Sequence, residues 1–230
     1  MLCKCFSVLP YMLVALVFES VANVIPPNSD SKNVTQDNVE VPLKKFDYYV
    51  SGFDYDNRPI IIMDSGKWDT EWLVERPDEC SKVLGNYAKY VDELSSGTFK
   101  YKFNNTYGKD NEINEEFVFI KDYDNYDFRR VQNSAVTKLG QQFLHLLKKF
   151  ESKLGYGFII NANPLVQQLM ELSRSTVGRV FERIDIYGTN SRKWIPQLLR
   201  KIPVDQLPPK YGGSQHEPIF KYDFLLGAKI

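Results

Sequence analysis

The chain has 230 residues, enough for one domain with a substantial hydrophobic core and no need of disulfide cross-links. It carries 29 basic and 29 acidic residues. This balance argues against a nucleic-acid-binding protein, which needs a basic face to displace counterions from phosphates. Aromatic residues make up 14% of the chain, and they either fill an ordinary core or line a ligand cavity.

The first 22 residues have the pattern of a secretory signal peptide. Lys4 supplies a positive charge ahead of an apolar run over 6–18, and the small residues Ser20 and Ala22 precede a possible cleavage point. The run is shorter than the roughly 20 residues of a transmembrane helix. An anchor retained at the membrane interface is the alternative. We therefore expect a protein that is secreted or resides in the secretory pathway.

Residues 23–45 predict a polar linker, because they are rich in Pro, Asn, Ser and charged residues. Sequons for N-glycosylation occur at 33–35 and 104–106, and in a secreted chain they predict a glycoprotein. Loss of the signal peptide would leave Cys80 as the remaining cysteine. We expect it to be a core thiol, since it falls on the apolar face of a predicted helix.

From residue 46 onward, strands and helices alternate. Runs of β-branched and aromatic residues predict strands, and apolar residues at helical spacing predict helices. Gly155 and Gly157 are expected to end the long helix predicted over 136–154. This order is typical of an α/β sheet with crossover helices. In chain order the predicted elements are strand 58–63, helix 77–94, strand 117–120, helix 136–154, strand 158–160, helix 164–181, strand 184–187 and helix 191–202.

Six short segments, taken together and in order, resemble the CRAL-TRIO lipid-binding domain. They begin with Phe-Asp-Tyr-Asp-Asn-Arg-Pro at 53–59 and end with Gln-Leu-Pro-Pro-Lys-Tyr-Gly-Gly at 206–213. The intervening segments are 66–69, 121–126, 159–162 and 186–188. The resemblance implies a CRAL-TRIO domain over 46–213, followed by a C-terminal tail over 214–230.

The resemblance implies a mixed β-sheet that floors a hydrophobic lipid cavity, covered by helices that include a gating helix at 164–173. It further implies a carrier of one hydrophobic ligand, such as a phospholipid, retinoid or tocopherol-like isoprenoid, with transient contact to a membrane surface. A lipid-sensing or protein-interaction module of the same fold is the alternative. By pattern alone, an ordinary core helix is the favoured interpretation of this segment. The residues implied in ligand binding are Phe119, Phe143, Leu147, Phe158, Ile160, Leu165, Val166, Leu169, Met170, Leu172, Arg183 and Ile186.

The chain departs from the family's pattern at three places. The signal peptide and linker stand where relatives carry a helical domain. Ser-Arg-Ser-Thr at 173–176 replaces the usual hinge. Arg183 occupies the position of a headgroup-binding cation, but Gln141 stands where its acidic partner is expected. An arginine alone can still grip a phosphate through paired hydrogen bonds.

We predict that the protein is not an enzyme and uses no cofactor or metal. The chain has two histidines: His145 is expected to be a structural or rim residue, and His216 to be solvated. Ser65 follows a predicted strand and could be considered as a nucleophile, but nothing in the sequence supplies it with a base. A lipid hydrolase is therefore the less favoured hypothesis. The Asp- and Tyr-rich cluster at 122–127 could bind a protein partner, although a solvated turn is commoner for this composition.

Overall fold

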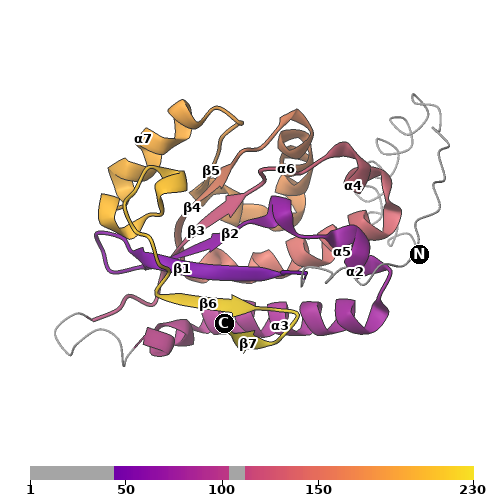
Figure 1. Ribbon diagram of the computed structural model, residues 1–230, viewed down its shortest axis with the longest axis horizontal. Coiled ribbons are helices and arrows are strands. Elements are labelled where there is room, and N and C mark those ends of the chain that lie inside the picture. Colours follow the sequence, from indigo (N-terminus) through magenta and orange to yellow (C-terminus); the bar gives the residue numbers. More distant parts are fainter. Residues whose placement is uncertain (1–43, 104–111) are drawn as a thin grey trace, which may run out of the picture.

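The computed structural model describes residues 44–103 and 112–230. The predicted signal peptide, both sequons and nearly all of the predicted linker lie outside these residues. The described residues form a mixed sheet with the strand order β5-β4-β3-β2-β1-β6-β7 (Figure 1). The strands are β1 (Asp47–Phe53), β2 (Pro59–Met63), β3 (Phe117–Asp122), β4 (Leu154–Ile160), β5 (Ile184–Ile186), β6 (Phe220–Asp223) and β7 (Ala228–Lys229).

The four strands β2 to β5 run parallel. Neither β2 nor β3 has an exposed residue, as expected for strands covered on both faces. β1 pairs antiparallel with β2, and β6 and β7 continue the sheet antiparallel beyond β1. The mixed α/β sheet predicted from the sequence is confirmed.

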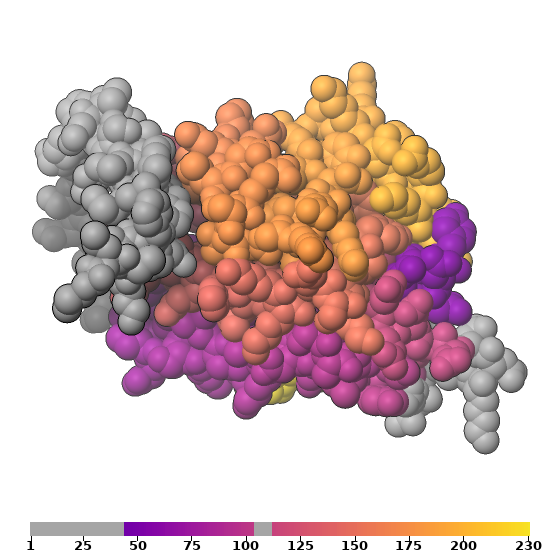
Figure 2. All heavy atoms as spheres, turned by 180° about the vertical axis from the view of Figure 1, so that it is seen from behind, coloured from indigo at the N-terminus to yellow at the C-terminus, as the bar shows by residue number. Residues whose placement is uncertain are grey.

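Helices cover both faces of this sheet. On one face, α3, α5 and α6 lie in successive bands, which Figure 2 shows in magenta, salmon and orange. The α-helices are α2 (Thr70–Val74), α3 (Pro77–Ser96), α4 (Phe128–Gln132), α5 (Ser134–Leu147), α6 (Pro164–Val177) and α7 (Ser191–Lys201). The 3-10 turns are η1 (Ser65–Lys67), η2 (Thr98–Phe103), η3 (Lys148–Ser152), η4 (Gly178–Arg183), η5 (Val204–Gln206) and η6 (Pro209–Tyr211).

The sheet separates two hydrophobic cores, because successive side chains of a strand point to opposite faces. We call the larger one the first core; it lies between the sheet and α3, α5 and α6 and includes Tyr48, Met63 and Phe119. The second core lies between the sheet and α7 and includes Ile62 and Trp194. Both faces of the sheet are therefore buried against helices.

The long helix predicted over 136–154 is shorter in the structure. α5 ends at Leu147, and the chain passes through η3 directly into β4. Gly155 and Gly157 lie inside that strand rather than at a helix end. A Cβ atom on Gly157 would lie 3.1 Å from the carbonyl oxygen of Phe119 in the neighbouring strand. Close packing between strands, not a helix stop, therefore favours a glycine at this position.

The C-terminal segment predicted as a tail contributes two strands to the sheet. β6 pairs with β1 along its length, with Tyr48 opposite Tyr222. Phe220 and Phe224 are both buried in the first core. The segment therefore belongs to the folded body of the protein. β1 was not predicted, because Asp47 at its start and Ser51 and Gly52 near its end interrupt its hydrophobic pattern.

Candidate ligand-binding interior

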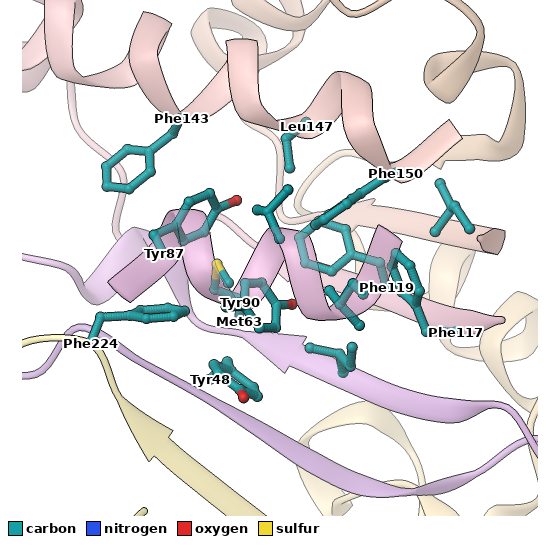
Figure 3. Packing of buried hydrophobic residues seen from close by; sticks show 14 of the residues in the cluster. Tyr48, Met63, Tyr87, Tyr90, Phe117, Phe119, Phe143, Leu147, Phe150 and Phe224 are labelled. Atoms are coloured by element: carbon teal, nitrogen blue, oxygen red, sulfur yellow. The ribbon is translucent and has the colours of Figure 1, made fainter. Parts of the chain in front are cut away.

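The first core is the candidate site for a ligand, because it holds most of the residues that the family resemblance points to. The sheet, α3 and α5 enclose this core, and α6 also packs against it. Aromatic side chains fill the space between these elements (Figure 3). The ring centroids of Tyr87 and Phe143 are 4.7 Å apart, and those of Phe119 and Phe150 are 5.8 Å apart. The interior is therefore apolar and tightly packed.

The structure brings seven of the twelve predicted ligand residues together around this core. They come from β3, α5, α6 and β5, which the sequence separates by up to 67 positions (186 − 119). Five are buried and two are partly buried against the core. The seven residues are Phe119, Phe143, Leu147, Val166, Leu169, Met170 and Ile186.

Phe158 and Ile160 lie elsewhere, in the second core under α7. The alternation of side chains along β4 explains this, because Ile159 faces the first core and its two neighbours must face the opposite side. The prediction that Phe158 and Ile160 line the same space as Phe143 is therefore wrong.

α6 covers the first core with one stripe of apolar side chains. Val166, Met170 and Val177 are buried in the core. Leu165 and Leu172 are partly buried and lie outside the set of residues that packs on either core. The helix predicted as the gate is thus amphipathic and presents a narrow apolar face to the interior.

The two ends of α6 differ in how they join the rest of the fold. At the start, the side chain of Asn163 accepts a hydrogen bond from the backbone N–H of Val166 and donates one to the carbonyl oxygen of Tyr126. Gln167 donates to the carbonyl oxygen of Ala162. At the end, Gly178 adopts φ 70° and ψ −138°, a backbone conformation that glycine tolerates far better than other residues.

A polar cluster closes the carboxyl ends of β2, β3 and β4. Asp122 is buried and accepts hydrogen bonds from Asn161 at 2.8 Å and from Tyr211 at 3.1 Å, and it forms an ion pair with Lys210 at 2.5 Å. Burial acts to raise the pKa of Asp122, but the hydrogen bonds from Lys210 and Asn161 outweigh it and lower the pKa below its usual value. Tyr211 also donates to Asp64 at 2.8 Å. The cluster ties the Pro-Pro-Lys-Tyr-Gly-Gly segment to the sheet.

Arg183 does not lie in the first core. It is exposed at the end of η4 and donates a hydrogen bond to the carbonyl oxygen of Leu154 at 2.7 Å. It borders a surface hollow of about 630 Å³ with Lys148, Lys149 and Arg179, along with Glu151, Glu182 and Ser152. The predicted headgroup cation therefore lies on a basic surface, apart from the apolar interior.

The sequence analysis missed Lys121, which the structure places on the first-core face of the sheet. The strand predicted over 117–120 stopped just before Lys121, which was therefore assigned to a turn. β3 continues to Asp122, which puts Lys121 in register with Met63 of β2 and Ile159 of β4. Burial lowers the pKa of Lys121 to about 8.

His145 and His216 are both exposed. Within residues 44–103 and 112–230, no group of three or more His, Cys, Asp or Glu side chains has the arrangement of a metal site. In the same part of the chain, no helix has the length and apolar character needed to span a bilayer.

Comparison with known proteins agrees with this geometry. Residues 43–213 match the CRAL/TRIO domain. The chain belongs to the CRAL-TRIO family. Members of this family bind lipophilic ligands and are generally not enzymes.

The chain is also similar to a protein of known structure, described as the crystal structure of Sfh5, with 13% sequence identity and a TM-score of 0.41. The alignment covers 70% of this chain and 54% of that one, so the chain spans about half of that protein's length. No curated protein matches the chain.

Proposed function

We propose that this CRAL-TRIO protein binds one hydrophobic ligand in the first core and exchanges it with membranes when α6 moves away from the sheet. The observation that carries the proposal is the apolar stripe of α6, in which Val166, Met170 and Val177 lie on an interior made almost wholly of aromatic and aliphatic side chains. A ligand chain gains about 0.8 kcal/mol for each CH₂ group removed from water. Such a site needs no catalytic group.

We further propose that the protein acts in the secretory pathway or outside the cell. The pattern of residues 1–22 supports this part of the proposal. The basic surface around Arg183 and Lys149 supports contact with a membrane during exchange, because lysine and arginine are attracted to anionic lipid headgroups.

Native mass spectrometry and lipid extraction of the full chain, purified from a secreting host, test the binding. We expect a lipid to co-purify, and we expect the protein to take up a fluorescent lipid or retinoid and release it to acceptor vesicles. Binding without release would favour the sensing module over the carrier. A protein that co-purifies with no lipid and takes up neither probe would contradict the proposal.

A matched pair of variants on α6 locates the site. Met170→Gln puts an amide into the apolar interior and should weaken uptake by about tenfold, since burying an unpaired amide costs roughly 1–3 kcal/mol. Gln168→Glu changes the exposed side of the same helix and should leave uptake unchanged. Equal uptake by Met170→Gln and the unaltered protein, both folded by circular dichroism, would place the ligand elsewhere.

A further inference from the structure

Lys121 is a cation placed among apolar side chains. Its neighbours on this side are Phe119 in β3, Tyr123 just after the end of β3, and Met63 and Ile159 in the strands on either side. All four belong to the first core. A lysine at this position is unusual, because burial in apolar surroundings disfavours its charged form.

No acidic side chain of the described residues pairs with Lys121. Its ammonium nitrogen lies 5.4 Å from the centroid of the Tyr123 ring. The adjacent carboxylate, Asp122, points to the other face of the sheet and is already bound by Lys210 and Asn161. Lys121 is partly exposed, and its positive charge therefore has no acidic partner within residues 44–103 and 112–230.

A second polar group lies in the same region of the core. The hydroxyl of Tyr87 is fully buried and makes no hydrogen bond with any described residue. Burial raises the pKa of Tyr87, and the nearby hydroxyl of Tyr123 raises it further. Figure 3 shows the Tyr87 hydroxyl directed toward α5, between Phe143 and Leu147. Tyr87 and Tyr123 both belong to the first core, as do the residues around Lys121.

We propose that Lys121 and Tyr87 bind the acidic headgroup of the ligand, either a carboxylate or a phosphate. This inference rests on the proposed lipid-binding function. An ammonium and a phenolic hydroxyl both donate hydrogen bonds to anionic oxygens, and such charge-assisted bonds are stronger than those between neutral groups. The apolar tail then lies along Phe119, Phe143 and Met170. A neutral lipid would leave the lysine unpaired, so the site selects acidic amphiphiles.

Binding of three lipids to the full chain tests this selectivity: oleic acid, dioleoyl phosphatidic acid and oleyl alcohol. We expect at least one of the two acids to bind about tenfold more tightly than the alcohol. The stronger of the two identifies the headgroup as a carboxylate or a phosphate. Lys121→Met should remove this preference by weakening the binding of the preferred acid by about tenfold. Tyr87→Phe should reduce the preference by a smaller factor, because it removes one donor.

Two further variants serve as controls. Lys121→Arg keeps the charge and should retain the preference for acid. Arg183→Met removes an exposed cation on the basic surface and should also retain it. If the unaltered protein binds oleyl alcohol as tightly as both acids, or if Lys121→Met retains the preference for acid, the headgroup assignment is wrong while the proposed function stands. If none of the three lipids binds while the protein takes up a retinoid or another neutral lipid, the headgroup assignment is likewise wrong and the proposed function stands. If no lipid of any kind binds, the proposed function itself fails.

Discussion

At the scale of single residues, the burial of Lys121 has a measurable effect on stability. Its pKa is lowered to about 8 in the folded protein, against about 10.4 in an unfolded chain. Below pH 8 both states are protonated, and the folded state bears the full cost of the buried charge. Between about pH 8 and pH 10.4 the unfolded state binds more protons, so stability rises with pH.

We therefore expect Lys121→Met to raise the free energy of unfolding by about 1–3 kcal/mol at pH 7, after allowance for the partial exposure of the lysine. The gain should shrink as the pH rises from 8 to 10. Urea denaturation at several pH values measures it. Lys138→Met, on the exposed side of α5, should change stability by less than about 0.5 kcal/mol at each pH. A gain for Lys121→Met that is equal at pH 7 and pH 10 would contradict the burial of the charge.

The same residue shows how far the sequence could predict the site. Seven of the twelve predicted positions lie around one core, because apolar residues on helices and strands must face some interior. Lys121 was beyond prediction, since its role depends on β3 being two residues longer than its apolar run. Phe158 and Ile160 were misplaced because a continuous apolar run does not reveal which residues face which side of a sheet.

At the scale of elements, Gly178 fixes the length of α6. The sequence predicted one helix over 164–181, and its apolar spacing continues past 178. The positive φ of Gly178 breaks the helix and starts η4. The low helix propensity of a single glycine favours the break only weakly. The position of the break therefore depends on the tertiary structure.

We expect Gly178→Ala to destabilise the protein by about 1–2 kcal/mol, because a Cβ atom is disfavoured at φ 70° and ψ −138°. Thermal or urea unfolding measures this effect. Gly140 lies within α5, where an added Cβ atom meets nothing within 4 Å. Gly140→Ala should therefore stabilise the protein by about 0.5–1 kcal/mol. Opposite signs for the two variants are expected, and equal signs would contradict the assigned backbone conformations.

At the scale of the whole molecule, the C-terminal strands complete the first core. The CRAL-TRIO match ends at residue 213, yet Phe224 beyond it is fully buried and contacts the rings of Tyr87 and Tyr90. Its backbone N–H donates to the carbonyl oxygen of Phe46 at 2.8 Å. The sequence analysis assigned this segment to a tail, because two short strands with a turn between them carry too few residues for a clear periodic pattern.

We expect Phe224→Ala to lower the free energy of unfolding by about 3–5 kcal/mol, since it removes a buried ring and leaves a cavity. Leu226 lies two residues away and is 44% exposed. Leu226→Ala should cost less than about 0.5 kcal/mol. Urea denaturation of the two variants compares them directly. Similar small losses for both would show that the C-terminal strands are dispensable to the fold.

The hydrogen bonds around Asn163 and the cluster around Asp122 give any motion of α6 a direction. Asn161 is bound to Asp122, and two residues later Asn163 begins the helix while bonded to Tyr126. The first turn is therefore anchored at the carboxyl ends of the strands, where Lys210 and Tyr211 bind Asp122. The opposite end stops at Gly178, where an added Cβ atom would meet nothing within 4 Å. α6 would pivot about its first turn, and a ligand would enter or leave beneath its last one.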